Sequence, residues 1–228
     1  MNDLFSVKNK VALITGGTRG IGLMIARGYV RSGAKVYICS RNSEVGKEEA
    51  EKLSKEGECF YIPSDLSSQK GVTALSEEIK SKESQIHLLI NNAGKTWGAP
   101  LEEYPMDSWD LVIRLNVSSP FQLIKEILPL LKKAGLSEDP SRIINIGSPA
   151  GSLSGGLNAY AYNTSKAALH HLTRILAANL IREKIIVNAI APGPFPTWML
   201  STGVGFGGET DVDWTAVGNG NPSGRVGD

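Results

Sequence analysis

Short runs of Val, Ile and Leu alternate along the chain with longer stretches of helical period. The short runs predict strands, because parallel strands that are buried on both faces carry apolar side chains on both sides. We expect these strands at Val11–Gly16, Lys35–Ser40, Cys59–Pro63, Ile86–Asn91, Arg142–Gly147 and Ile185–Ile190. The longer stretches predict helices near residues 20–32, 43–56, 69–83, 107–133 and 160–182. The alternation predicts an α/β fold, a Rossmann-type doubly wound parallel sheet in a single domain.

The pattern changes near residue 200. Residues 201–228 contain 8 of the 25 glycines and follow neither period. Segments of this composition do not bury enough apolar surface to order themselves, so we expect a mobile, Gly-rich loop there.

Composition narrows the class of protein. The 24 Lys and Arg residues and the 23 Asp and Glu residues leave a formal charge of +1, which gives no support for nucleic-acid binding or for an anionic membrane surface as partner. No apolar run approaches the length of a membrane span, and Asp3 in the first ten residues argues against a secretory signal. We expect a cytoplasmic protein whose two cysteines, Cys39 and Cys59, are reduced and buried. No metal site is predicted, because His170 and His171 are adjacent and point to different sides of their helix.

A glycine-rich turn follows the first predicted strand. It reads Thr15-Gly16-Gly17-Thr18-Arg19-Gly20-Ile21-Gly22 and departs from the G-x-G-x-x-G spacing. The chemistry is nevertheless that of a phosphate cradle, since a tight turn leads into a helix whose free N–H groups favour anions. We therefore expect a dinucleotide at this turn.

The residues after the second strand indicate which dinucleotide is bound. NAD sites usually carry an acid there, whereas this chain reads Ser40-Arg41-Asn42 and has no acid before Glu44. Arg41 and Arg19 present guanidinium groups that suit a 2′-phosphate, and the Ser40 hydroxyl assists them. The sequence therefore predicts NADP.

Tyr162 and Lys166 are four residues apart, so they share one face of a predicted helix. A phenol with a pKa near ~10 transfers protons poorly at neutral pH, and a nearby ammonium is expected to lower that pKa. Ser148, at the end of the fifth strand, is then placed to hydrogen-bond a substrate oxygen.

Together these motifs resemble the short-chain dehydrogenase/reductase family. The resemblance runs from about residue 7 to Thr197 and includes Asn91-Asn92-Ala93-Gly94, Asn116 and Pro192-Gly193-Pro194-Phe195-Pro196-Thr197. It implies that Tyr162 donates a proton, that Lys166 lowers the pKa of Tyr162 and holds the nicotinamide ribose, and that Ser148 orients a carbonyl. The catalytic residues that it implies are Asn116, Ser148, Tyr162 and Lys166. The cofactor-binding residues predicted from the turn and the resemblance are Gly16, Thr18, Arg19, Gly20, Ile21, Gly22, Ser40, Arg41, Asp65, Leu66, Asn92, Ala93, Gly94, Tyr162, Lys166, Ile190, Pro192, Gly193 and Thr197.

Asn116 carries a hypothesis of its own. In this family its backbone oxygen is thought to hold a water that relays protons to the active-site lysine. Pro120 has no N–H to donate to the carbonyl four residues earlier, which belongs to Asn116. We hypothesise that Pro120 keeps this oxygen free and bends the helix.

The resemblance implies an NADPH-dependent carbonyl reductase in a domain formed by residues 1–200. Within the family, segments such as residues 92–100 and 144–148 are similar to 3-oxoacyl reductases of the rhamnolipid-pathway type, so a ketone or 3-oxoacyl thioester is the expected substrate. Trp97, Phe195, Trp198 and Met199 are candidate walls of an apolar pocket. The alternatives are a sugar-acid or polyol dehydrogenase of the gluconate 5-dehydrogenase kind, and a truncated NADP-binding protein with little activity. The last parallel strand of the family is expected to be missing, which leaves Ile185–Ile190 as a sheet edge, and helices 107–133 and 160–182 are expected to form a homodimer or homotetramer.

Overall fold

Six parallel strands form one sheet at the centre of the molecule. The computed structural model describes residues 5–153, 158–203 and 212–227. The strands lie in the order β3-β2-β1-β4-β5-β6, the order of a doubly wound Rossmann-type sheet. Their bounds are β1 Val11–Thr15, β2 Lys35–Ser40, β3 Cys59–Pro63, β4 Leu88–Asn91, β5 Ser141–Ile146 and β6 Ile185–Ile190. The fold class predicted from the sequence is confirmed.

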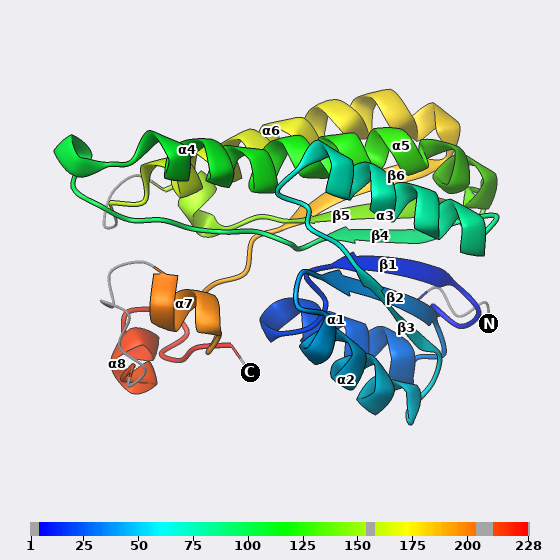
Figure 1. Cartoon of the computed structure of the whole chain (residues 1–228), viewed down its shortest axis with the longest axis horizontal. Helices are drawn as coiled ribbons and strands as arrows, with labels where there is room; N and C mark the ends of the chain where they lie inside the picture. The colour runs from blue at the N-terminus through cyan, green and yellow to red at the C-terminus, as the bar shows by residue number, and fades with distance from the viewer. Residues whose placement is uncertain (1–4, 154–157, 204–211, 228) are drawn as a thin grey trace.

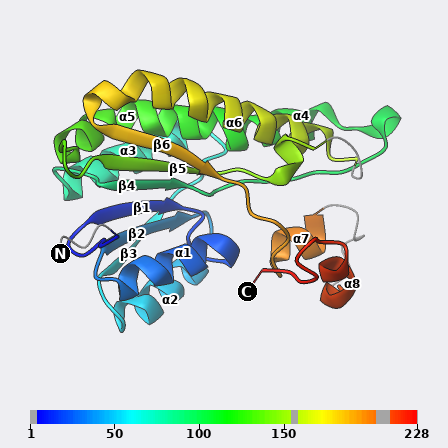
Figure 2. The same cartoon turned by 180° about the vertical axis from the view of Figure 1, so that it is seen from behind.

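Helices cover both faces of this sheet (Figure 1). They are α1 Gly20–Arg31, α2 Ser43–Ser54, α3 Gln69–Lys82, α4 Met106–Ile113, α5 Ser119–Ala134 and α6 Tyr160–Leu180, with short helical turns at η1 Leu101–Glu103, η3 Pro149–Gly151 and η4 Ile181–Glu183. The views from both sides agree that α1 and α2 lie on one face and α3, α5 and α6 on the other (Figures 1 and 2). Each face has its own apolar core, as continuous Val, Ile and Leu runs in the strands require.

The long helix predicted over residues 107–133 is divided in two. Between α4 and α5 the chain forms a π-helical turn, η2 Arg114–Ser118, which contains the buried Asn116. The Ser119 N–H bonds the Arg114 carbonyl, and the Ser119 hydroxyl donates to the Leu66 carbonyl at 2.6 Å. Pro120 follows at the start of α5. A π-helical turn thus interrupts the α-helical bonding just before Pro120, while the predicted bend and the free Asn116 carbonyl remain predictions.

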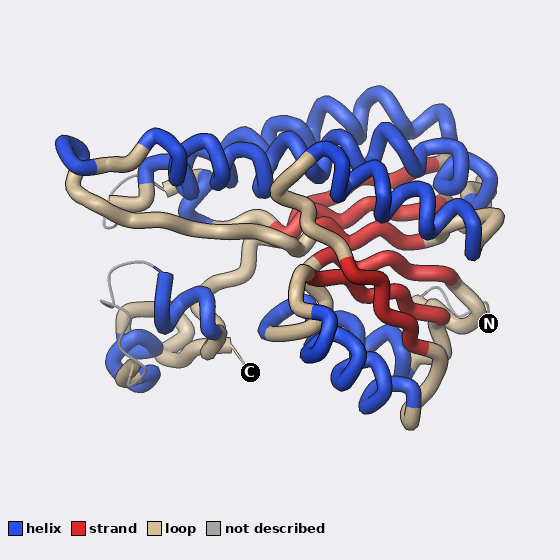
Figure 3. The backbone as a smooth tube through the Cα atoms, viewed as in Figure 1, coloured by secondary structure: helices blue, strands red, loops and turns tan. Residues whose placement is uncertain are grey.

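One end of the sheet is an edge. Among the described strands, β6 pairs with β5 alone. The carboxyl-terminal half of β6 is exposed, and Ile190 is 49% exposed. The chain then passes the carboxyl ends of the strands to α7 Trp198–Gly203 and α8 Trp214–Asn219 (Figure 3). These two short helices lie where the sequence indicates no regular structure. The end of the described chain returns to this region, because the Gly227 N–H bonds the Pro194 carbonyl at 2.9 Å.

Cys39 and Cys59 are free and buried, as predicted. Burial raises the pKa of each thiol to about 12, so both are inert small apolar side chains at neutral pH. In the part of the chain that the structure describes, no helix combines the length and the hydropathy of a transmembrane span.

Candidate functional site

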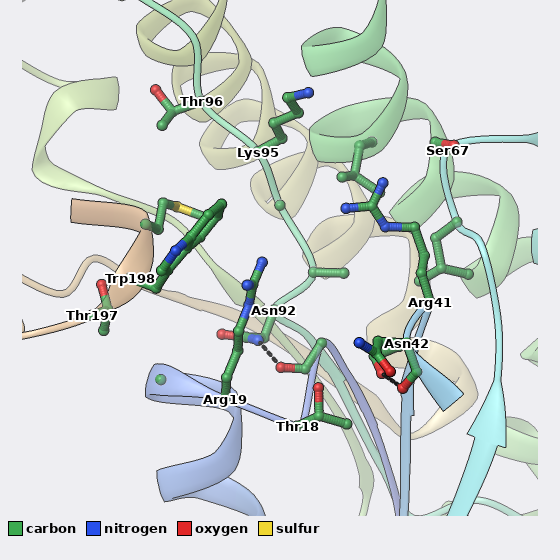
Figure 4. A pocket seen from close by; sticks show the side chains of 18 of the residues that line it. Thr18, Arg19, Arg41, Asn42, Ser67, Asn92, Lys95, Thr96, Thr197 and Trp198 are labelled. Atoms are coloured by element: carbon green, nitrogen blue, oxygen red, sulfur yellow. Dashed lines mark hydrogen bonds between the residues drawn. The ribbon is translucent and has the colours of Figure 1, made fainter. Parts of the chain in front are cut away.

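An open groove of about 1310 Å³ lies outside the carboxyl ends of the strands, where doubly wound sheets bind their ligands. It runs from the first glycine turn to the loop after β4 and on to α7 (Figure 4). Its lining includes most of the predicted cofactor-binding residues: Gly16, Thr18, Arg19, Gly20, Ile21, Ser40, Arg41, Asp65, Leu66, Asn92, Ala93, Gly94 and Thr197. The structure thus brings these residues together in one groove, and their roles in cofactor binding remain a prediction.

The glycine turn brings the backbone of Gly16 close to the start of α1 at Gly22. Gly16 has φ +64°, a conformation that favours glycine. A Cβ on Gly22 would lie 2.2 Å from the Gly16 carbonyl oxygen and 2.4 Å from the Asn92 side chain. Positions 16 and 22 therefore have no room for a side chain, and the turn leads directly into α1, which has no acidic residue in its first turn. A helix start of this kind attracts phosphate.

Asn92 fastens the glycine turn to the end of β4. Its side-chain amide donates to the Thr15 and Gly16 carbonyls, both at 3.0 Å. The Thr15 hydroxyl accepts the N–H groups of Asn92 and Ala93 at 3.0 Å each and donates to the Ile90 carbonyl at 3.3 Å. Asn92, predicted as a cofactor-binding residue, is thus committed through its side chain to holding the turn. Thr15 was not singled out from the sequence, although its place at the end of a buried strand is a usable signal.

Two exposed arginines face the groove from neighbouring elements (Figure 4). Burial, and to a lesser extent the nearby charge of Arg41, lower the pKa of Arg19. Hydrogen bonds with Ser67, and to a lesser extent the charge of Arg41, lower the pKa of Asp65. Glu44, the nearest acid after β2, does not line the groove. Asn42 instead caps α2 by accepting the Glu44 and Val45 N–H groups at 3.1 and 3.2 Å. A cationic wall at this point fits the extra phosphate of NADP.

Arg19 also links the glycine turn to the segment after β6. Its guanidinium carbon lies 4.4 Å from the ring centroid of Trp198, at cation–π distance, and the two side chains lie side by side in Figure 4. A Cβ on Gly20 would lie 3.1 Å from the Thr197 methyl carbon. The start of α1 and the start of α7 therefore form one continuous wall of the groove.

Tyr162, Lys166 and Ser148 lie together at the end of β5. The Lys166 ammonium is 5.5 Å from the Tyr162 ring centroid and donates to the Ile146 carbonyl at 2.7 Å. The Ser148 side chain hydrogen-bonds with Tyr162. The shared helix face predicted from the spacing is confirmed. None of the three belongs to the groove lining itself, and neither do Ile190, Pro192 and Gly193.

The direction of the Tyr162 pKa corrects the expectation from the sequence. Burial raises the pKa of Tyr162, and only the Ser148 hydrogen bond opposes that shift. Burial also lowers the pKa of Lys166 to about 8. The net direction of the Tyr162 pKa is therefore opposite to the expected one, because desolvation disfavours the charged forms of both side chains and the Lys166 ammonium donates to the Ile146 carbonyl. Tyr162 is consequently protonated at neutral pH, which is the state of a proton donor.

Asn116 connects the proton-transfer residues with the groove. Its side-chain amide donates to the Lys95 carbonyl and to the Ser165 hydroxyl, and its side-chain oxygen accepts the Lys95 N–H, all at 2.9 Å. Ser165 in turn donates to the Tyr162 carbonyl at 2.7 Å. Asn116 is 1% exposed and Ser165 is fully buried, so these bonds are shielded from water. The sequence singled out Asn116 for its backbone oxygen, whereas the structure adds a bridging role for the side chain.

Further polar residues beneath the site were missed from the sequence. Asn91 donates to Asn145 at 2.8 Å, and Asn145 donates to Thr173 on α6 at 2.9 Å. His170, interpreted from the sequence as packing, approaches the Ser148 N–H at 3.4 Å. Sequence signals for them exist. Asn91 and Asn145 are polar residues at the ends of buried strands, and His170 follows Lys166 by four residues.

Comparison with known proteins agrees with this geometry. The profile of the short chain dehydrogenase family matches residues 10–203. The rhamnolipids biosynthesis 3-oxoacyl-[acyl-carrier-protein] reductase of Pseudomonas aeruginosa is 49% identical over 199 residues, which are 87% of this chain and 78% of that protein. The 5-keto-D-gluconate 5-reductase of Escherichia coli (strain K12) is 35% identical over 202 residues, covering 87% of this chain and 77% of its own length.

Solved structures give the same answer. The Pseudomonas aeruginosa RhlG/NADP active-site complex superposes with a TM-score of 0.92 at 45% identity, over 100% of this chain and 88% of that one. The matched region includes the sheet, the glycine turn and the segment with Tyr162 and Lys166. On these grounds the chain belongs to the short-chain dehydrogenase/reductase family.

Proposed function

We propose that this protein is an NADPH-dependent carbonyl reductase that acts on a 3-oxoacyl thioester or a similar ketone. The observation that carries the proposal is a protonated Tyr162, hydrogen-bonded to Ser148, next to a groove whose nucleotide end bears Arg19 and Arg41. The similarity to a 3-oxoacyl-[acyl-carrier-protein] reductase and to an NADP complex supports the substrate and the cofactor.

Bound NADPH supplies the hydride that reduces the carbonyl carbon. The Tyr162 hydroxyl gives its proton to the carbonyl oxygen, and its raised pKa keeps that proton available at neutral pH. The Ser148 oxygen accepts the Ala150 N–H at 3.2 Å, and the Ser148 hydroxyl hydrogen, which favours the charged form of Tyr162 in this structure, would be donated to the substrate oxygen once a ketone is bound. The Lys166 ammonium stabilises the negative charge that Tyr162 acquires. The cofactor roles of the groove-lining residues, and of Ile190, Pro192 and Gly193, follow the family resemblance.

The substrate end of the groove has large apolar rings. Trp97 is 40% exposed and Trp198 is 60% exposed, and both line the groove together with Met199. Rings of this size suit an acyl chain. Lys95 lies 5.8 Å from the Trp97 ring centroid, which leaves a cation near the same wall. The apolar rings favour an acyl substrate over a keto-sugar.

The test is NADPH oxidation by the purified protein against a 3-oxoacyl thioester, a small diketone and 5-keto-D-gluconate, with Tyr162→Phe as the matched control. Turnover of the thioester at the highest kcat/KM, lost in the Tyr162→Phe variant, supports the proposal. Preference for the keto-sugar would select the sugar-acid reductase instead. NADPH binding without turnover of any ketone would select a cofactor-binding protein with little activity.

We infer a homodimer or homotetramer that uses the outer face of α4, α5 and α6. Three large apolar side chains are exposed there: Met106 at 65%, Phe121 at 49% and Ile175 at 46%. Exposed apolar groups of this kind mark interaction surfaces when they are contiguous. Sedimentation of the wild type and of Phe121→Glu tests the inference, and a monomeric wild type would contradict it.

We also propose that residues 1–200 carry cofactor binding and catalysis. The segment 201–228 is the one predicted from the sequence as a mobile loop at the substrate end, and its residues 204–211 and 228 lie outside the described residues. The cap that Asp213 provides for α8, with bonds of 2.9 and 3.0 Å to the Thr215 and Ala216 N–H groups, supports local order within that loop. Limited proteolysis should cut within residues 201–228 first, and should be slowed by NADPH together with substrate.

A further inference from the structure

The turn after β5 carries Ser148, and each of the residues 146, 147 and 148 makes a hydrogen bond through its backbone. The Ile146 carbonyl accepts from the Lys166 ammonium at 2.7 Å, and the Gly147 N–H donates to the Ile190 carbonyl at 2.6 Å. The Ser148 N–H points at the Nε2 atom of His170, at 3.4 Å. Two of the three partners, Lys166 and His170, are one turn apart on α6, and Tyr162 precedes them by one turn.

The His170 ring also packs against Gly147. A Cβ built on Gly147 would lie 2.2 Å from Nε2 and 2.7 Å from Cδ2 of His170. Any side chain at position 147 would therefore displace the imidazole. The ring thus makes two contacts with the turn: an acceptor beneath the Ser148 N–H and a flat surface against Gly147.

We propose that His170 is a positioning residue, whose neutral imidazole holds the Gly147–Ser148 turn so that the Ser148 hydroxyl meets Tyr162. The proposal rests on the proposed carbonyl reduction. In that reaction Ser148 contacts both the proton donor and the substrate oxygen, so a small shift of the turn changes the chemical step rather than cofactor binding.

Only one protonation state of His170 performs this task. Nε2 accepts a hydrogen bond when the ring is neutral and carries its proton on Nδ1. A protonated ring would direct an N–H group at the Ser148 N–H and would repel Lys166. Burial, Lys166 and Arg174 all lower the pKa of His170, which keeps the ring neutral at neutral pH. Both cations belong to α6, whereas the described part of the β5 turn presents the uncharged Gly147 and Ser148 to the ring.

The neighbouring His171 provides a matched control. It lies on the same helix but is exposed, and its Nδ1 atom is 3.2 Å from the Arg174 guanidinium rather than near the Ser148 turn. Replacing either histidine removes one imidazole from α6. Only the change at position 170 removes the acceptor beneath Ser148.

The experiment compares His170→Leu, His170→Gln and His171→Leu with the wild type in the ketone reduction. We expect His170→Leu to lower kcat about tenfold, the loss of roughly one hydrogen bond, with the KM for NADPH unchanged. His170→Gln keeps an acceptor and should retain kcat within about threefold. The wild type should lose activity at acid pH, below the ordinary range of a histidine pKa, because the pKa of His170 is lowered; His170→Gln should lack this decline, because no ring remains to be protonated. His171→Leu should match the wild type in rate and in pH profile.

Equal rates for His170→Leu and the wild type would overturn the proposal. So would an unchanged acid limb in His170→Gln. If the wild type reduces no ketone, the proposed function fails, and hydrogen exchange at the Ser148 amide then decides the positioning role alone. Faster exchange in folded His170→Gln or His170→Leu than in His171→Leu supports it, and equal exchange rejects it. If His170→Leu does not fold, the exchange rate and the acid limb of His170→Gln carry the same decision.

Discussion

The nucleotide end and the proton-transfer end of the site are built in opposite ways. At the nucleotide end, Arg19 and Arg41 are exposed, and the glycines of the turn bring its backbone to the surface of the groove. At the proton-transfer end, the buried Asn116 and Ser165 are joined by a hydrogen bond, and the buried Lys166 ammonium donates to the Ile146 carbonyl. The nucleotide end presents exposed charges to an incoming ligand, whereas the proton-transfer end keeps its polar groups away from solvent.

This difference separates binding from chemistry. Exposed guanidinium groups attract a phosphate at small structural cost, but they tune no pKa strongly. Burial shifts the pKa of Tyr162 upward and that of Lys166 downward, and it makes each lost hydrogen bond expensive. Substitutions at the nucleotide end should therefore change cofactor affinity, whereas substitutions at the other end should change rate or stability.

The largest effect is expected at Tyr162. Replacing Tyr162 with Phe removes the proton donor while keeping the buried ring, so kcat should fall by about 10²–10⁴-fold. The affinity for NADPH, measured by quenching of protein fluorescence, should stay within about twofold, since the lost hydroxyl contributes one hydrogen bond at most. A parallel loss of affinity and rate would show that the two ends are not separate.

The next effect concerns stability. Asn116→Ala leaves the Lys95 N–H, the Lys95 carbonyl and the Ser165 hydroxyl without their partner, so the free energy of unfolding should fall by about 3 kcal/mol. Urea denaturation measures this. Asn179→Ala is the matched control, because Asn179 bonds the Ile175 carbonyl in an exposed position on α6 and should cost under about 0.5 kcal/mol. Equal losses would show that the Asn116 bridge is no stronger than a surface bond.

At the nucleotide end, Arg41→Asp should raise the KM for NADPH by about 10–100-fold and lower that for NADH. The reason is that a carboxylate repels the 2′-phosphate and accepts from the free ribose hydroxyl instead. Arg27→Asp changes the same charge on the exposed side of α1, away from the groove, and should leave the preference unchanged. An unaltered ratio in Arg41→Asp would remove Arg41 from cofactor selection.

The smallest effect is a pH dependence. Below about pH 8 the Lys166 ammonium is present, and above it the charge is lost, so kcat/KM for reduction should decline by up to about tenfold per pH unit. Oxidation of the hydroxy product should rise with pH over the same range, because Tyr162 has a raised pKa and must lose its proton first. Stopped assays from pH 6 to about pH 10 in both directions measure this. A flat profile for reduction would mean that the Lys166 charge does not assist Tyr162.

Much of this architecture follows from the sequence. The strand Lys35–Ser40 has the same limits in the structure as in the sequence pattern, and the four-residue spacing of Tyr162 and Lys166 places both on one side of α6. These features depend on local periodicity and on turn chemistry. The groove follows as well, because the carboxyl ends of parallel strands always meet at one edge.

Other features depend on distant parts of the chain. The π-turn before Ser119 is fixed by a bond to the Leu66 carbonyl, which no local pattern reveals. The pKa direction of Tyr162 results from burial, a property of the folded protein. Helices α7 and α8 are six residues long each, too short for a periodic signal. His170 was missed because its partner, the Ser148 amide, is 22 residues away.

The stacking of Arg19 on Trp198 has a practical consequence for anyone redesigning cofactor preference. Arg41 projects into the groove at a distance from α7, so its replacement leaves the contact between Arg19 and Trp198 intact. Replacing Arg19 removes the platform on which an indole rests. A library aimed at nucleotide selectivity should accordingly vary position 41 first, because a change at position 19 also alters the contact with Trp198.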